Sequence, residues 1–160
     1  MTVTKDHVAR VVQAIEALAK QRVLIGITAP KGPRRENESI DNASLGYIHE
    51  FGSPARGIPP RPFLVPGIRA AESNTIAVLR HAAVSAIGVA SPQEIATRGL
   101  GLAGQAAQAS VQRTIRAGEG FAPLAVRTLA ARARKGFKGT KVLIQTGQLL
   151  RSITYVVRSR

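Results

Sequence analysis

Residues 47–69 have the sequence YIHEFGSPARGIPPRPFLVPGIR, which holds five of the nine prolines and two of the four phenylalanines of the chain. So many prolines exclude a continuous helix or strand, and the apolar residues argue against a floppy linker. A stiff, partly apolar connection of this kind takes a fixed path and often contacts a partner. We expect residues 53–62 to form a Pro-rich connection within one domain that spans residues 1–160.

The chain before this stretch predicts one amphipathic helix and one strand. Apolar residues recur at three- and four-residue spacing over residues 4–20, and Val8, Val12 and Ile15 belong to the expected inner face. The β-branched run near 22–28 predicts a buried strand.

A polar segment and a short helix are expected next. Residues 29–41 carry mixed charges and predict a solvated loop. Asp41 or Asn42 then caps a helix over residues 43–51, which Gly52 ends. The expected inner face of this helix is formed by Leu45, Ile48 and Phe51.

The chain after the Pro-rich connection predicts a helical excursion over about residues 63–118. Its first part is one long helix, from Phe63 to about Ile87, with Pro62 and Pro66 tolerated in the first turn. The sequence SPQE from Ser91 is a helix start, and this second helix could run to Ala117.

The last third predicts a short basic helix over residues 124–134, a lysine-rich loop at 136–141, and a turn with a short helix over 143–152. A final strand near 152–158 must pair with the strand near 22–28, because a lone strand leaves its backbone groups unsatisfied. The fold class is therefore α+β, with a small β-sheet packed with long Ala-rich helices.

Composition favours assembly with other molecules. Only 4% of the residues are aromatic, and alanine-rich helices bury little area each. We expect modest stability for the isolated chain, for which oligomerisation would compensate. The net charge is +14, of which +11 lies in residues 98–160, where twelve Lys and Arg stand against Glu119 alone. Most acidic residues lie in the first half, and such a polar molecule suits head-to-tail stacking.

An enzyme is a weak alternative. The pair His49 and Glu50 resembles a general base with its neighbour, but adjacent helical residues point about 100° apart. The simpler interpretation is that His49 packs near the Pro-rich turn and Glu50 pairs with an arginine. The three histidines are far apart, cysteine is absent, and the carboxylates form no cluster, so we expect no catalytic residues, no metal and no cofactor.

The basic last third leaves three interpretations open: a nucleic-acid groove, a lining that faces DNA without specific contacts, or a face for an acidic protein. Aromatic residues for base stacking are almost absent, so sequence-specific recognition is not expected. No stretch approaches the roughly 20 apolar residues that a spanning helix needs, and the N-terminus has no apolar signal region, so no membrane partner is expected.

Three stretches together resemble a known family. They are residues 47–52 with 58–64, residues 121–130, and residues 143–154, which have the sequence LIQTGQLLRSIT. In this order they resemble the tail-completion or virion-morphogenesis proteins of long-tailed bacteriophages and prophages, which help to join head and tail at the neck. The family often has an acidic residue where this chain has Gln145, so a cap or ion pair made by that acid is in doubt here.

The resemblance implies a non-enzymatic structural protein of the virion, located in the neck or at the head-proximal end of the tail, and in the host cytoplasm during assembly. It implies a homo-oligomeric ring, expected to be a hexamer, around the DNA path. The expected partners are other copies of the chain, neighbouring neck, connector or tail-tube proteins, and passing DNA. The alternative is a standalone non-specific nucleic-acid-binding protein.

Two sets of residues are candidates for these contacts. The candidates for contact between subunits are His49, Glu50, Phe51, Ile58, Pro59, Pro60, Arg61, Pro62 and Phe63. The candidates that face DNA or an acidic partner are Arg127, Arg132, Arg134, Lys135, Lys138, Lys141 and Arg151.

Overall fold

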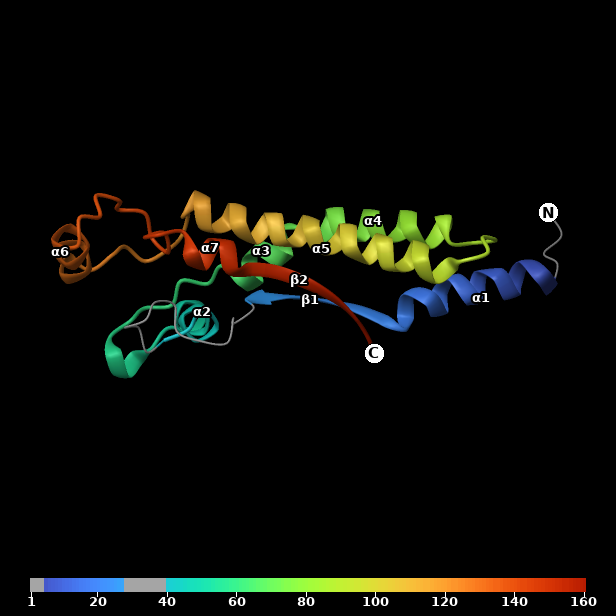
Figure 1. Cartoon of the computed structure of the whole chain (residues 1–160), viewed down its shortest axis with the longest axis horizontal. Helices are drawn as coiled ribbons and strands as arrows, with labels where there is room; N and C mark the ends of the chain where they lie inside the picture. The colour runs from blue at the N-terminus through green and yellow to red at the C-terminus, as the bar shows by residue number, and fades with distance from the viewer. Residues whose placement is uncertain (1–4, 28–39) are drawn as a thin grey trace. The chain divides into compact units, whose positions relative to one another are not determined.

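The computed structural model of the chain describes residues 5–27 and 40–160. These residues form seven α-helices, one 3₁₀-helix and a two-stranded antiparallel sheet (Figure 1), which confirms the α+β fold class. Strand β1 (Gln21–Ile27) pairs with β2 (Ile153–Ser159), as the sequence predicts. The predicted loop over 29–41 lies almost entirely outside the described residues.

The helices begin and end close to the predicted positions, because their caps are local signals. The α5 helix starts at Pro92 and the next residue after its end is Gly118, with a φ of 70°. The helices are α1 (Lys5–Ala19), α2 (Asn42–Phe51), α3 (Leu64–Ala70), α4 (Glu72–Ser85), α5 (Pro92–Ala117), α6 (Val126–Arg134) and α7 (Gln148–Ser152), and the 3₁₀-helix η1 is Pro54–Arg56.

The prediction of one long helix from Phe63 to Ile87 is wrong. The helix is interrupted at Ala71, which separates α3 from α4. Pro66 does not cause the break, since the amide of Gly67 still donates to the carbonyl of Phe63 at 3.1 Å. The break lies next to the point where the chain passes from one compact unit to another, and nothing in the local sequence marks it.

By its internal contacts the chain divides into two compact units, each described here by itself. Unit 1 comprises residues 1–25, 70–108 and 155–160, and unit 2 comprises residues 26–69 and 109–154. The expectation of a single domain stays a prediction.

Alanine fills the interior of unit 1. Helix α1 packs against α4, and α4 lies beside α5 (Figure 1), where Gly99 fits directly against the methyl group of Ala82. Without a side chain at residue 99 the two backbones can approach closely. The buried apolar residues in the described part of this unit are Ala14, Ala17, Ala71, Ala82, Ala86, Ala96, Leu100, Ala103 and Ala107.

Larger side chains fill the interior of unit 2. Phe63, the residue before α3, is 1% exposed. It belongs to one buried cluster with residues of α5, of α7 and of the start of β2. Gly67 permits this packing, because a Cβ there would lie 2.6 Å from the Cα of Val111. The buried members of the cluster are Phe63, Val111, Ile115, Leu143, Leu149 and Ile153.

Helix α2 belongs to unit 2 and presents an unexpected face to its interior. The predicted inner residues Leu45 and Ile48 are only half-buried and Phe51 is exposed. The buried positions are instead four residues apart, and Gly46 lies against the side chains of Ile27 and Phe63. A small residue at the closest approach lets α2 sit near the core. The buried residues of α2 are Asn42, Gly46 and Glu50.

The start of α2 agrees with the predicted cap. Asp41 accepts a hydrogen bond from the amide of Ser44 at 2.6 Å, which is the usual N-cap geometry. That bond favours the ionised carboxylate and holds the pKa of Asp41 below its ordinary value.

Candidate interaction site

The three stretches that carry the family resemblance meet around one cavity in unit 2. The cavity has a volume of about 260 Å³. Its walls come from α2 and the Pro-rich segment, from residues 124–128 at the start of α6, and from the segment 142–149. Residues as far apart in the sequence as Leu45 and Leu149 therefore form one site.

Glu50 fastens the first wall. Its carboxylate accepts hydrogen bonds from the amides of Phe63, Leu64 and Val65 at 2.7, 2.9 and 3.0 Å. These are the otherwise unsatisfied amides at the N-terminus of α3, so Glu50 acts as a buried cap from another helix. The expectation that Glu50 pairs with an arginine is wrong. Both oxygens of the Glu50 carboxylate already accept hydrogen bonds from backbone amides, so neither is free to act as a general base. Its neighbour His49 borders the cavity.

The Pro-rich segment is a closed turn. The backbones of Ser53 and Ile58 form an antiparallel bridge with hydrogen bonds of 2.8 and 3.0 Å, and η1 lies between them. Gly57 makes the turn possible with a left-handed φ of 60°. The segment is thus fixed in path, as the prolines predict.

Arg61 ties this turn to the second stretch. Its Nε donates to the carbonyl of Ala122 at 2.7 Å and its Nη2 to that of Pro123 at 2.8 Å. The side chain is 6% exposed. Arg61 was predicted as a contact between subunits, but the structure uses it inside the subunit.

Arg132 ties α6 to the loop that leads into the third stretch. Its Nη1 donates to the carbonyls of Gly139, Lys141 and Ile144 at 3.1, 2.9 and 3.3 Å. The side chain is 7% exposed, and this burial lowers the pKa of Arg132. Its buried Nε has no hydrogen-bond partner among the residues that the structure describes. Arg132 was a candidate for facing DNA or an acidic partner, and the structure instead buries its side chain and bonds its Nη1 inside the fold, at the wall of the cavity.

The other contact candidates divide by exposure. Phe63 is in the core, Ile58 is half-buried, and Pro59, Pro60 and Pro62 are exposed. Phe51 is also exposed and its ring lies 4.8 Å from that of Tyr47, centroid to centroid. Sequence reasoning missed Tyr47 as a surface residue, although its spacing of four residues from Phe51 on a helix predicts that the rings meet.

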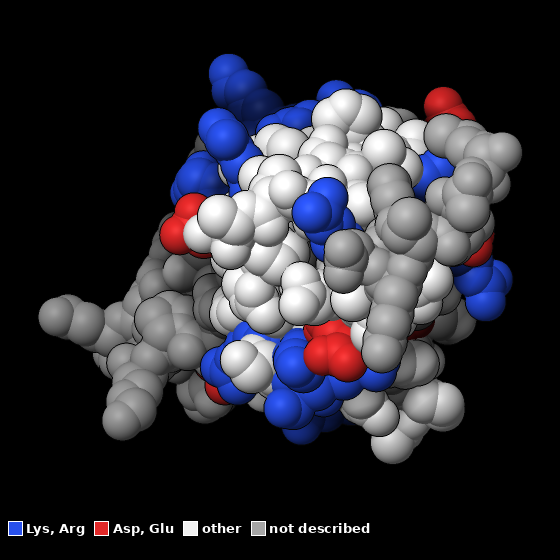
Figure 2. Space-filling view, turned by 90° about the vertical axis from the view of Figure 1, so that its right-hand side faces the viewer, with Lys and Arg blue, Asp and Glu red and all other residues white. Residues whose placement is uncertain are grey.

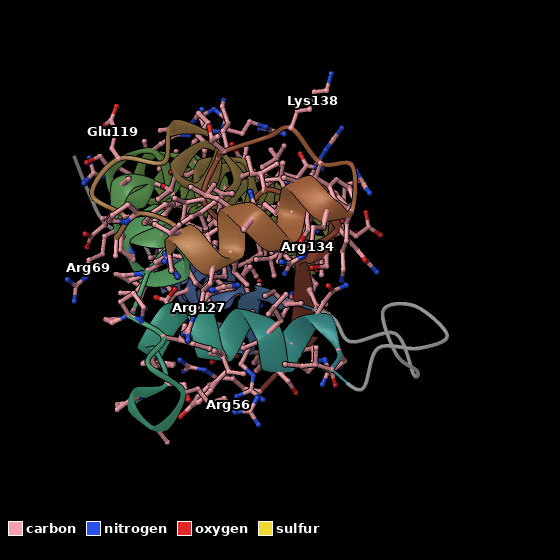
Figure 3. The ribbon with its side chains drawn as sticks, turned by 90° about the vertical axis from the view of Figure 1, so that its left-hand side faces the viewer. Arg56, Arg69, Glu119, Arg127, Arg134 and Lys138 are labelled. Carbon is pink, nitrogen blue, oxygen red and sulfur yellow. The ribbon has the colours of Figure 1, made fainter. Side chains whose placement is uncertain are left out.

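The remaining basic candidates of the last third lie on the surface. In the view of Figure 3, Arg127 lies on the side of α6 toward α2, while Lys138 points outward from its loop. Nη2 of Arg127 reaches over Gly57, where an added Cβ would be 3.9 Å away. The exposed candidates are Arg127, Arg134, Lys135, Lys138, Lys141 and Arg151, and no ion pair involves them among the described residues.

Neither a metal cluster nor a membrane-spanning helix is found in the part of the chain that the structure describes. No group of three or more His, Asp or Glu residues there could hold a metal ion. None of the described helices is long and apolar enough to cross a membrane.

Comparisons with known proteins give no relative. No protein-family model, no curated protein and no solved structure matches this chain.

Proposed function

We propose that this chain is a structural protein of a bacteriophage virion, which assembles as a ring in the neck or at the head-proximal end of the tail, around the DNA path, and helps to complete the tail and join it to the head. The neighbours in this assignment are connector, neck or tail-tube proteins. The position in the virion rests on the family resemblance, and the structure contributes support for assembly.

The observation that carries the proposal is the reversal of side-chain sizes in unit 1. Alanines are inside, whereas the larger side chains are on the surface, and Ile15 is 59% exposed. The stripe of α1 that sequence periodicity places inward is therefore uncovered. Figure 2 is turned toward the side on which α1 lies, and most of the described surface in this view is neutral. The exposed large apolar residues of unit 1 are Val8, Val11, Val12, Ile15, Leu24, Ile76, Val84, Ile87, Val89, Leu102 and Val156.

Burial of such a surface supplies the energy of assembly. Covering a Val, Leu or Ile side chain is worth about 1.5–3 kcal/mol when the burial is complete, and contiguous apolar surface on a soluble protein usually marks an interaction site. An isolated chain would leave this free energy unused. Ring formation between copies would use it, in agreement with the modest stability that the composition predicts.

The geometry of unit 2 argues against the enzyme alternative. A general base must be within hydrogen-bond reach of a substrate proton, and the carboxylate of Glu50 is instead engaged by three backbone amides. The pair His49–Glu50 thus lacks the free carboxylate that the alternative requires.

The test compares Ile15→Glu with Gln13→Glu. Both changes add one negative charge to exposed positions of α1, but only the first removes an apolar side chain. We expect the wild type and Gln13→Glu to sediment as a ring and Ile15→Glu to shift strongly toward the monomer in analytical ultracentrifugation. A wild-type chain that stays monomeric at high concentration, even with tail tubes added, would contradict the proposal. A phage that lacks the gene and still yields joined, infectious particles would do the same.

A second candidate function is non-specific nucleic-acid binding, which the unpaired surface cations of unit 2 favour. For such binding, the logarithm of the binding constant falls linearly with the logarithm of the salt concentration, and the slope is set by the number of phosphates contacted. A steep slope for a short DNA duplex, measured with a chain that remains monomeric, would favour this candidate over the ring. Absence of binding at low salt would remove it.

A further inference from the structure

The cavity of unit 2 combines positive charge with an apolar wall. Three arginines border it, namely Arg61, Arg127 and Arg132, and no Asp or Glu is among its described lining residues. Leu45, Ile58 and Leu124 contribute apolar surface. A concave, partly apolar site strengthens the attraction of a cationic group for an anion, because the local dielectric constant is low.

One of these arginines, Arg127, has hydrogen-bond capacity that the described part of the chain does not use. A guanidinium has five N–H donors. Arg61 and Arg132 are buried and donate to backbone carbonyls, so they contribute positive charge beside the cavity. Arg127 has no ion pair in the described part of the chain, and its guanidinium extends over Gly57 at the edge of the same cavity. An anionic group in the cavity would accept hydrogen bonds from the guanidinium of Arg127.

The size of the cavity selects among anions. Pockets for cofactors and drug-sized ligands have volumes of roughly 300–1,000 Å³, and this cavity is somewhat smaller, at about 260 Å³. It suits one side chain with its immediate neighbours. The apolar wall favours a carboxylate on an aliphatic stem over the phosphate of a nucleic acid, whose flanking groups are polar sugars.

We propose that this cavity binds the carboxylate of an acidic side chain, flanked by an apolar residue, from a partner protein. The identification of that partner as a neighbouring virion protein rests on the proposed function, whereas the binding chemistry does not. The cavity would then be the point at which the basic unit 2 recognises an acidic neighbour.

The test uses two acetylated and amidated tripeptides, Leu-Glu-Leu and Leu-Gln-Leu, with the full-length chain. Binding is measured by ligand-observed NMR, which works for a large ring as well as for a single chain. We expect Leu-Glu-Leu to bind at least about tenfold more tightly than Leu-Gln-Leu, since charge-assisted hydrogen bonds are the stronger ones. No binding of Leu-Glu-Leu at about 10 mM, where a millimolar site would be largely filled, overturns the proposal.

Matched variants locate the binding. Arg127→Gln and Arg134→Gln remove the same charge from exposed positions of α6, but only Arg127 borders the cavity. Arg127→Gln should weaken Leu-Glu-Leu binding about tenfold, and Arg134→Gln should leave it unchanged. Equal losses in both variants would indicate a diffuse field and overturn the proposal.

The remaining outcomes separate this proposal from its alternatives. If a 20-base-pair DNA duplex binds with the same dependence on Arg127 and displaces Leu-Glu-Leu, the cavity is a phosphate site and the proposal is wrong. Ring formation is measured in a separate experiment, by the sedimentation of the wild type and of Ile15→Glu. Peptide binding without a ring would leave the cavity site in place and remove the proposed function, and a ring without peptide binding would do the opposite.

Discussion

The two units solve the problem of a stable interior in opposite ways. Unit 2 buries Phe63, Ile115 and Ile153 almost completely, whereas unit 1 buries mainly alanines and leaves Val12 and Ile15 on its surface. Burial of a large aliphatic or aromatic side chain contributes far more free energy than burial of a methyl group. The comparison indicates that unit 2 supplies most of the stability of the single chain, and that unit 1 exposes apolar surface which the proposed assembly would cover.

The units also differ in charge. The sequence of unit 2 has fifteen Lys and Arg and five Asp and Glu, a net charge of +10, whereas unit 1 has eight and four, a net charge of +4. Two of the arginines in unit 2, Arg61 and Arg132, bond to backbone carbonyls inside the fold, and most of the others are exposed. Unit 1 is therefore suited to apolar contacts and unit 2 to electrostatic ones.

The largest expected effect comes from Phe63→Ala. Loss of this buried ring should lower the free energy of unfolding of unit 2 by about 3–5 kcal/mol. Val65→Ala is the control, because Val65 is exposed and should change the same quantity by less than about 0.5 kcal/mol. This free energy is measured for both variants by urea denaturation that is monitored through hydrogen exchange of the unit 2 amides. Equal stability of the two variants would mean that unit 2 does not depend on its large core residues.

A smaller effect is expected from the buried cap. Glu50→Ala leaves three amides without their acceptor, which should cost about 2–3 kcal/mol. Glu50→Gln keeps a carbonyl oxygen and should lose about 1 kcal/mol. Hydrogen exchange at Phe63, Leu64 and Val65 reports the cap directly, and unchanged protection in Glu50→Ala would show that the start of α3 is held by other contacts.

The smallest expected effect probes the close packing of unit 1. Gly99→Ala places a methyl group against Ala82, which should destabilise the α4–α5 contact by about 1–2 kcal/mol. Gly101→Ala has room, since the nearest atom is the Tyr155 hydroxyl oxygen at 4.0 Å from the added Cβ, and should gain about 1 kcal/mol from helix propensity. The stability of the two variants is compared by thermal unfolding monitored by circular dichroism. An increase in stability in both variants would show that the helices in unit 1 are not held at close range.

Local sequence signals predict the elements well. Ser91 before Pro92, Asp41 before α2, and the β-branched run of β1 each act within a few residues, so the sequence is sufficient to find them. The break at Ala71 has no such signal. Periodicity identifies an apolar face but not what covers it, which is why the stripe of α1 was expected to be buried.

Roles that depend on distant residues could not be predicted. Glu50 caps a helix that begins fourteen residues later, and Arg61 bonds to carbonyls about sixty residues away. In both cases the partner is a backbone group, which has no signature in the sequence. Arg132 is buried among carbonyls for the same reason, although its neighbours on α6 are the surface cations that the charge pattern predicts.

The way the chain is threaded through the two units has a consequence for genetics and protein engineering. The chain crosses between them four times, within β1, α3, α5 and β2. No single truncation, and no single proteolytic cut, can release either unit whole, because three further covalent connections remain. A simple deletion therefore cannot remove the apolar surface of unit 1 and keep the cavity of unit 2. The apolar surface of unit 1 and the cavity of unit 2 must therefore be inherited together. An engineer who wants to keep only one of them has to disable the other by point substitution.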